Sequence, residues 1–146
     1  MMYIFVELDR LVPHEMHDEN HAREIADDIR KRGVLLRPIV IHKLENGKYM
    51  VVDGHHRTTA LKRLGCKYAA ATLIDYTSGD IRVMSWKGDK AWEKKEIVAR
   101  AVTGKLLPPK TTKHEIKIRD GYLPFYNNDA VEPVIAVELT RLKDGY

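Results

Sequence analysis

Cysteine is almost missing from this sequence, since Cys66 is the only one among 146 residues. One thiol cannot form an internal disulfide framework or a multi-cysteine metal site, so the sequence excludes both. A long apolar run and an N-terminal signal peptide are also missing, and we therefore expect a soluble, cytoplasmic protein. Cys66 follows Gly65 beside an expected strand, which favours a small buried hydrophobic residue over a nucleophile.

Two common phosphate-binding loops are absent as well. The sequence has neither a glycine-rich Walker loop nor a G-x-G-x-x-G dinucleotide motif. The net charge is +4, but the basic residues are interleaved with 21 acidic ones and form no run of five or more. This balance is compatible with nucleic acid and equally with a nucleotide or another phosphate compound. We find no internal repeat and no low-complexity segment.

The overall composition, with 44% hydrophobic and 32% charged residues, is typical of a folded protein. A chain of this length is expected to form one domain with a real core. We predict a single α+β domain over residues 1–146, with a small mixed sheet and flanking helices. Within it, residues 1–105 would form the core and residues 106–146 a substrate loop and a C-terminal extension.

The clearest element is a helix from about Glu19 to Lys31. Its apolar residues form one stripe, acidic residues lie early and basic residues late, and Asp18 and Gly33 are typical of its two ends. A second helix is expected from about His55 to Leu64, and a third over residues 90–102.

Strands are indicated by short apolar or alternating runs bounded by turn residues. We expect a first strand over residues 3–8 and a hairpin of 38–43 with 49–52, in which Asn46-Gly47 supplies the turn. Further strands are expected over residues 68–76, 81–86 and 115–119, and a proline-stiffened loop over 106–114. After Asp120 the pattern is ambiguous: Pro133 could begin a helix, but β-branched residues favour a strand over 134–139.

The stretch Asp53-Gly54-His55-His56-Arg57 carries the strongest chemical signal. A strand that ends at a glycine and continues into a helix presents free N–H groups and the positive end of the helix dipole, which favour an anion. The alternative is a helix capped by Asp53 and flanked by exposed basic residues. We favour the anion site, because several ionisable side chains at the end of an apolar strand are costly unless they are paired or functional.

Other candidates are weaker on their own. His14-Glu15-Met16-His17 resembles a zinc-protease motif, but that motif has its second histidine one place later and on a helix. His17 and His21 are best interpreted as solvated histidines. Glu15 lies in a loop before the first helix, where it is either an ordinary loop acid or the partner of a site elsewhere. Trp86 and Trp92 are by default core or rim aromatic residues.

Three motifs together resemble the ParB/sulfiredoxin superfamily and, within it, the archaeal free L-serine kinases. They are Leu11-Val12-Pro13-His14-Glu15, the stretch from Val52 to Gly65, and the run from Leu107 to His114. Sulfiredoxins place a catalytic cysteine where this chain has His55, which excludes their chemistry. The chromosome-partitioning ParB proteins carry Gly-Glu-Arg-Arg at the same turn and an additional helix-turn-helix region, for which the remaining chain is too short.

The resemblance implies a role for each matching residue. Glu15 would be the general base for the serine hydroxyl, and Asp53 the second essential carboxylate. The nucleotide phosphates would be bound by Gly54, His55, His56, Arg57 and Thr58. The amino acid would be contacted by Trp86, Lys110, Thr112 and His114. Two departures are visible: the kinases carry an extra segment between the positions of Trp86 and Lys110, and Lys110 replaces an expected arginine, which exchanges a bidentate fork for a point charge.

These observations lead to a functional hypothesis. We expect a kinase that transfers a phosphoryl group from ADP or ATP to free L-serine, with Mg²⁺ held mainly by the nucleotide phosphates and no dedicated metal site in the protein. It would act as a monomer or homodimer, with nucleic acid an unfavoured partner that the sequence does not exclude. The alternative is a nucleotide-binding ParB-like module that binds or cleaves DNA, favoured by the positive charge and the short chain. A nucleotide sensor without turnover is a third option.

Overall fold

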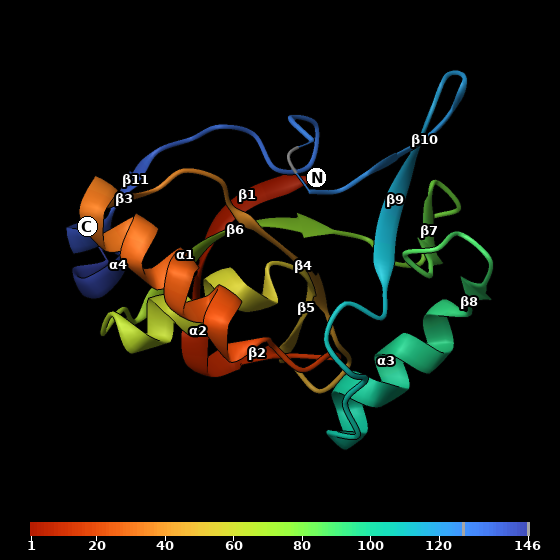
Figure 1. Cartoon of the computed structure of the whole chain (residues 1–146), viewed down its shortest axis with the longest axis horizontal. Coiled ribbons are helices and arrows are strands. Elements are labelled where there is room, and N and C mark those ends of the chain that lie inside the picture. The colour runs from red at the N-terminus through yellow and green to blue at the C-terminus, as the bar shows by residue number, and fades with distance from the viewer. Residues whose placement is uncertain (127, 146) are drawn as a thin grey trace.

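The computed structural model describes residues 1–126 and 128–145, and groups of strands separate its helices along the chain (Figure 1). The helices are α1 (Glu19–Arg32), α2 (His55–Arg63), α3 (Lys94–Thr103) and α4 (Leu139–Asp144), with a 3-10 turn over Leu8–Arg10. The strands are β1 (Met2–Glu7), β2 (Leu11–Val12), β3 (Val34–Leu35), β4 (Ile39–Lys43), β5 (Tyr49–Asp53), β6 (Tyr68–Ile74), β7 (Ile81–Met84), β8 (Ala91–Trp92), β9 (Lys113–Ile118), β10 (Gly121–Pro124) and β11 (Val137–Glu138).

The main sheet has the strand order β1-β6-β4-β5-β2 and is mixed. β6 pairs antiparallel with β1 and parallel with β4, while β5 pairs antiparallel with β4 and parallel with β2. A second sheet has the order β10-β9-β7-β8, and β11 pairs with β3 in a small ribbon. The predicted α+β class with a mixed sheet and flanking helices is confirmed.

The alternation of β4 divides the core into two apolar clusters. Ile39 and Ile41 belong to a cluster that includes residues of α1, α2 and α4, whereas Val40 belongs to a cluster with residues of α3, β7 and the C-terminal segment. Neighbouring side chains of a strand point to opposite faces of the sheet, so both faces are covered. All three residues are fully buried, which explains why the first three positions of β4 are all apolar.

The ends of α1 agree with the sequence signals. The Asp18 carboxylate accepts a hydrogen bond from the backbone N–H of His21 at 3.1 Å, and Gly33 ends the helix with φ of 73°. The hairpin of β4 and β5 is confirmed too, with Gly47 at φ of 84° in its turn. These local signals were sufficient because each acts within a few residues of the chain.

Two predicted elements differ from the structure. The helix expected over residues 90–102 begins only at Lys94, because Ala91 and Trp92 form β8 and pair with β7. The strand expected over residues 134–139 is confined to β11, and Leu139 begins α4, so each of the two alternatives for the tail is partly right. In both places strand pairing decides the conformation, with the preceding strand for β8 and with the distant β3 for β11, which residue propensity does not report.

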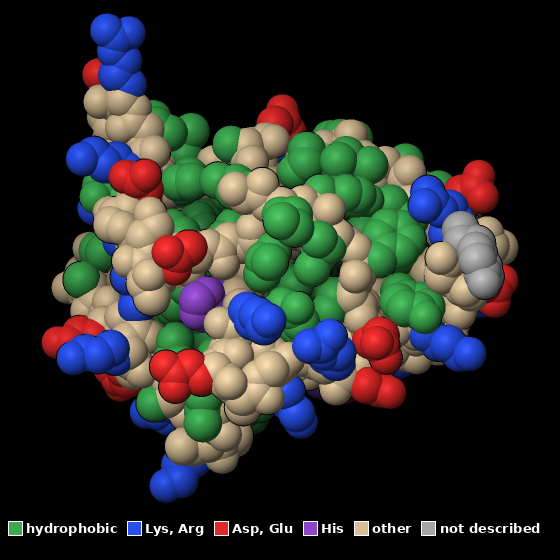
Figure 2. Space-filling view, turned by 180° about the vertical axis from the view of Figure 1, so that it is seen from behind, with side chains coloured by type: hydrophobic (Ala, Val, Ile, Leu, Met, Phe, Trp, Pro, Cys, Tyr) green, Lys and Arg blue, Asp and Glu red, His purple; other side chains and the backbone are tan. Residues whose placement is uncertain are grey.

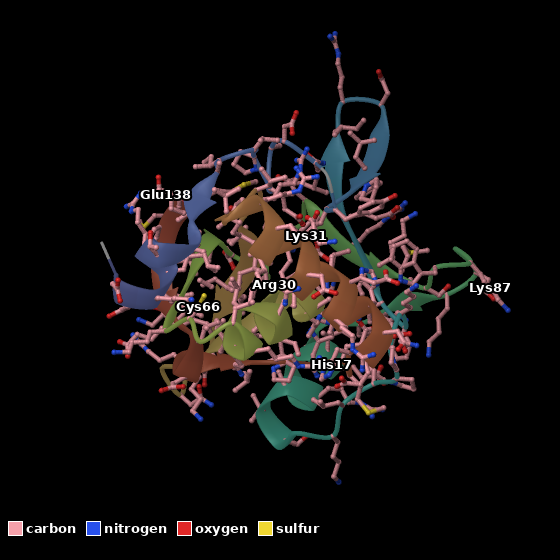
Figure 3. All side chains as sticks on the ribbon, turned by 60° about the vertical axis from the view of Figure 1, so that its left-hand side comes forward. His17, Arg30, Lys31, Cys66, Lys87 and Glu138 are labelled. Atoms are coloured by element: carbon pink, nitrogen blue, oxygen red, sulfur yellow. The ribbon has the colours of Figure 1, made fainter. Side chains whose placement is uncertain are left out.

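The surface is mixed in charge. Figure 2 shows Lys and Arg side chains next to Asp and Glu around apolar patches, without a continuous basic stripe on the face that it presents. Cys66 is buried in the first core cluster, as the sequence predicted, while Lys87 extends outward from the loop between β7 and β8 (Figure 3). Among the described helices, none has the length and apolar character needed to cross a membrane.

Candidate active site

The site begins where β5 ends at Asp53 and α2 begins at His55. Gly54 is the N-cap residue, with φ of 108°, and no side chain caps the first turn of α2. The alternative in which Asp53 caps the helix is therefore wrong. A helix N-terminus without a side-chain cap leaves N–H groups available for an anion, as the sequence predicted for this stretch.

Gly54 is required here by space as well as by its backbone angle. A Cβ atom at this position would lie 2.7 Å from Cγ2 of Ile39 and 3.0 Å from Nη2 of Arg57. The left-handed backbone at Gly54 is also unfavourable for residues with a side chain. The turn from β5 into α2 thus depends on this glycine.

A cleft of about 520 Å³ lies over this turn. Most of the predicted site residues line it, although they come from distant parts of the chain: Glu15, Asp53, Gly54, His55, His56, Arg57, Trp86, Lys110 and Thr112. The cleft is also lined by apolar residues of α1, β3 and the following loop, and by Trp86 and Tyr126, whose rings are 6.3 Å apart.

Thr58 and His114 are the two predicted site residues that do not line this cleft. Thr58 donates its hydroxyl hydrogen to the carbonyl oxygen of Gly54 at 2.9 Å and faces a neighbouring pocket instead. His114 is buried, and its Nε2 forms a hydrogen bond of 2.8 Å with the hydroxyl of Tyr76. The expected direct contact of His114 with an amino acid does not fit this position behind the cleft wall.

Glu15 is held against the loop between α3 and β9. The backbone N–H groups of Thr111 and Thr112 both donate to Oε1 of Glu15, the latter at 3.0 Å. Backbone hydrogen bonds from Leu107 to His14 and from Met16 to Leu107, of 3.0 and 2.8 Å, join the same two segments. Unlike an ordinary loop acid, Glu15 is therefore fixed by a second segment and lines the cleft together with Asp53.

The electrostatics of Glu15 suit proton transfer. Burial raises the pKa of its carboxyl from 4.5 to about 7, against the two backbone N–H donors that lower it, and the charge of Asp53 adds to the increase. A base with a pKa near the working pH combines a high ionised fraction with adequate proton affinity. Glu15 meets this condition.

A buried set of neutral histidines supports this arrangement. Nδ1 of His14 lies 2.8 Å from the carbonyl oxygen of Val51, and Nε2 lies 3.1 Å from the hydroxyl of Thr112. The backbone N–H of His14 donates to Nε2 of His55 at 3.3 Å. Burial lowers the pKa of His14 to about 4 and holds the pKa of His55 well below its usual value. These rings join β5 and α2 to the loop that holds Glu15.

His56 is also held by its neighbours. Its Nε2 accepts a hydrogen bond of 3.0 Å from the backbone N–H of Asp18, and its ring stacks on that of His21 with centroids 4.3 Å apart. Burial, with added repulsion from His21 and His17, lowers the pKa of His56 to about 4. His56 therefore links the starts of α1 and α2 as a neutral ring.

Arg57 differs most from its expected role. Its Nη1 donates to the carbonyl oxygen of Pro38 at 2.7 Å, and its Nη2 contacts Glu132 at 2.9 Å and Asp53 at 3.4 Å. Protein groups thus already engage much of the guanidinium. The contacts of Arg57 hold Asp53 and Glu132 in place and leave less of it for a phosphate. Glu132 was missed in the sequence, because the tail around it shows no periodicity.

Three residues could in principle hold a metal ion: the ligand atoms of His14, Glu15 and His55 lie within 4.8 Å of one another. Both ring nitrogens of His14 and Nε2 of His55 already have hydrogen-bond partners, so this set does not fit without rearrangement. Mg²⁺ prefers oxygen ligands and is commonly bound by one or two carboxylates together with phosphates. Asp53, on the cleft wall with a side chain 30% exposed, fits that requirement.

The pKa of Glu15 has a consequence for stability. A folded-state pKa of about 7 against 4.5 means that the carboxyl favours folding below pH 4.5 and that this contribution is lost as the pH rises through 7. Glu15→Gln keeps the two N–H acceptor contacts and removes the charge. The wild type should lose unfolding free energy between pH 5 and pH 8, whereas the variant should not. The difference in unfolding free energy, variant minus wild type, should therefore increase over this range by up to about 3 kcal/mol. Urea unfolding at both pH values measures this.

Glu24→Gln is the matched control, since Glu24 is exposed on α1. Its effect on unfolding should stay within about 0.5 kcal/mol at both pH values, as is usual for surface substitutions. An equal effect of Glu15→Gln at pH 5 and pH 8 would contradict the raised pKa.

Comparisons with known proteins agree with this geometry. The model of the ParB N-terminal domain matches residues 5–85, more than half of the chain. The chain is 32% identical over 99 residues to the ADP-dependent L-serine kinase SerK of Thermococcus kodakarensis, an alignment that covers 67% of this chain and 41% of that protein. It is 38% identical over 84 residues to the ATP-dependent L-serine kinase of Desulfurococcus mucosus, covering 57% and 33% of the two chains.

The chain therefore spans less than half the length of these two relatives. A solved structure of a free serine kinase in complex with AMP superposes with a TM-score of 0.78 at 18% identity, over 96% of this chain and 93% of that one. At this identity the similarity establishes a shared fold.

Proposed function

Because the chain belongs to the ParB N-terminal domain family, we propose that it is a kinase that transfers a phosphoryl group from ADP or ATP to free L-serine. The family membership inferred from the sequence motifs is thereby confirmed, while the activity is our proposal. One observation carries it: the carboxylate of Glu15 and the uncapped N-terminus of α2 face the same cleft. The names of the curated relatives, L-serine kinases that use ADP or ATP, support the same reaction.

The lining of the cleft suits the two parts of a nucleotide. The N–H groups at the start of α2 favour the phosphates, since they carry the positive end of the helix dipole. The apolar lining residues Ile25, Ile29 and Leu35 offer a surface for a flat base, and Asp28 lines the same cleft. A mostly apolar pocket with a few convergent polar groups is typical of small-molecule sites.

Glu15 would serve as the general base. The serine hydroxyl oxygen forms a bond to the terminal phosphorus, the bond from that phosphorus to the bridging oxygen breaks, and the hydroxyl proton moves to the Glu15 carboxylate. The products are O-phospho-L-serine and AMP from ADP, or ADP from ATP. The protein supplies position and charge neutralisation, which account for most catalysis of phosphoryl transfer.

Mg²⁺ bound to the nucleotide would neutralise phosphate charge in this reaction. Asp53 is the carboxylate that we propose to face it, and Arg57 holds Asp53 in place through the contact between Nη2 and Oδ2. This assignment gives Asp53 a positioning and electrostatic role, separate from that of Glu15.

The amino acid would bind beside Trp86, Lys110 and Thr112, which line the cleft. Lys110 has the left-handed φ of 57°, unusual for a residue with a side chain, and such strain is concentrated at functional sites. We propose that its ammonium group meets the carboxylate of serine or a phosphate oxygen. A lysine provides a point charge here, so specificity would depend on the groups around it.

The test is a direct assay. The purified protein is incubated with Mg²⁺, isotopically labelled L-serine and either ADP or ATP, and phosphoserine is measured together with AMP or ADP. We expect phosphoserine with at least one donor, and none when serine is replaced by alanine, which lacks the hydroxyl. If no amino acid is phosphorylated and the protein instead retains DNA with a steep salt dependence, the DNA-binding alternative replaces the kinase.

A further inference from the structure

We propose that His14 is a positioning residue of the cleft: its neutral ring accepts the hydrogen bond of the Thr112 hydroxyl and so leaves the Thr112 oxygen as an acceptor for the ammonium group of the amino acid. The kinetic part rests on the proposed function, whereas the part that concerns the ring does not. His14 lies directly before Glu15 but does not line the cleft itself. The sequence motifs and the resemblance assign it no role of its own.

The contacts of His14 fix which ring nitrogen carries a hydrogen. Nδ1 lies 2.8 Å from the carbonyl oxygen of Val51, and a carbonyl oxygen can only accept, so Nδ1 is the donor. In a neutral ring Nε2 then has a lone pair, and the hydroxyl of Thr112, 3.1 Å away, donates to it. The direction of both hydrogen bonds thus follows from one carbonyl group of β5.

The surroundings of His14 favour the neutral ring. Its side chain is fully buried. The rings of His55 and His114 lie nearly perpendicular to it, with centroids 4.5 and 5.4 Å away. Burial of this kind disfavours a charged imidazole. A charged ring would donate from Nε2 as well, and the hydroxyl hydrogen of Thr112 would then point elsewhere.

Thr112 is held at two of its atoms. Its backbone N–H donates to Oε1 of Glu15 at 3.0 Å, and its hydroxyl donates to His14. The residue is buried, yet it lines the cleft. Its hydroxyl hydrogen is already engaged, and Oγ1 has no further partner among the residues that the structure describes. The oxygen can therefore meet a ligand only as an acceptor.

An acceptor at this place selects among the polar groups of serine. The ammonium group offers only donors, whereas the carboxylate can only accept. The serine hydroxyl gives its hydrogen to Glu15 in the proposed reaction. The Thr112 oxygen therefore fits the ammonium group, and the carboxylate is left to Lys110, which lines the same cleft. A hydrogen bond to a charged group is stronger than one between neutral groups, so its loss should be measurable.

¹⁵N NMR of protein labelled at histidine tests the ring without an assay of activity. The His14 signals, identified by their loss in His14→Gln, should show at pH 7 a neutral imidazole with its hydrogen on Nδ1. A hydrogen on Nε2, or on both nitrogens, would overturn the proposal. If the protein phosphorylates no amino acid, the proposed function fails, and this measurement alone still decides whether His14 orients Thr112.

Two variants separate the two hydrogen bonds of His14. The amide of Asn reaches about as far as Nδ1 and can donate to Val51, whereas the amide of Gln reaches toward Nε2 and can accept from Thr112. We expect His14→Asn to lower kcat/KM for serine by about 10-fold or more, and His14→Gln to recover most of that loss. Equal rates for the two variants, or the reverse order, would refute the positioning role, because each variant keeps one hydrogen bond.

Selectivity tests the ammonium contact. 3-Hydroxypropanoate carries the hydroxyl and the carboxylate of serine but no amino group. Thr112→Val removes the hydroxyl and keeps the backbone N–H that holds Glu15. The ratio of kcat/KM for serine to that for 3-hydroxypropanoate, measured with nucleotide labelled in its terminal phosphate, should therefore fall by about 10-fold or more. His14→Asn should lower the ratio no further in this background, as for two residues that act through one contact.

Thr103→Val is the matched control, since Thr103 is exposed at the end of α3 and donates its hydroxyl hydrogen to the carbonyl oxygen of Ala99. It should keep the wild-type ratio. An unchanged ratio in Thr112→Val would refute the ammonium contact. If His14→Asn fails to fold, as judged by thermal unfolding, the ratio in Thr112→Val and the position of the hydrogen on the wild-type ring decide the question.

Discussion

Replacing Glu15 by Gln is expected to reduce the rate of phosphoryl transfer by about 1,000-fold, within the range that a positioned general base contributes. The carboxylate has two features of such a base: its pKa is raised to about 7, and Oε1 is fixed by two backbone N–H donors. Gln keeps the shape and can accept the same hydrogen bonds, but its amide cannot take a proton from a hydroxyl.

Binding should distinguish this loss from a structural one. Because the base acts in the chemical step, nucleotide affinity measured by titration calorimetry should change by no more than about threefold. Single-turnover measurements with labelled serine give the rate, and Glu24→Gln provides the same chemical change on an exposed part of α1. If Glu15→Gln weakens nucleotide binding as strongly as it slows transfer, Glu15 is a binding residue and the assignment fails.

Gly54→Ala is expected to destabilise the protein by about 3 kcal/mol or more and to abolish detectable nucleotide binding. The new Cβ would lie 2.7 Å from Cγ2 of Ile39, a fully buried side chain in the centre of the main sheet. Overpacking of this kind costs about 1–3 kcal/mol, and the left-handed backbone adds about 1–2 kcal/mol. Relief of the clash would move the turn that carries Asp53 and the start of α2.

Gly65→Ala is the matched control, because Gly65 has a similar left-handed φ of 79° but nothing within 4 Å of an added Cβ. It should lose only the backbone term of about 1–2 kcal/mol and retain nucleotide binding. Urea unfolding and calorimetric titration measure both quantities. Similar losses in the two variants would show that backbone strain alone matters and that the contact with Ile39 does not.

The sequence predicted the elements whose signals are local. The limits of α1 followed from Asp18 and Gly33, and the hairpin of β4 and β5 followed from Asn46-Gly47, because capping and turn preferences act over two to four residues. The anion site that we propose at Gly54 was predicted for the same reason: a strand, a glycine and a helix start are adjacent in the chain. Glu15 and Thr112 required the family resemblance, which joined motifs that no local pattern connects.

The roles of Arg57, His114 and Glu132 could not be derived in this way. Arg57 looked like a phosphate ligand because it follows the glycine turn, and only the fold shows that Glu132, Asp53 and the carbonyl of Pro38 engage it. The family resemblance implied that His114 is a substrate ligand, yet it packs behind the wall with Tyr76.

By itself, the sequence determined the glycine turn, the helix start and the presence of a carboxylate in each segment, since these depend on residue type and short spacing. Only the tertiary structure decided which carboxylates share a cation and which one is shielded from water, because charge pairing and desolvation depend on distances between segments far apart in the chain. Glu15, fixed by the loop before β9, and Asp53, paired with a tail glutamate through Arg57, owe their different chemistry to that packing.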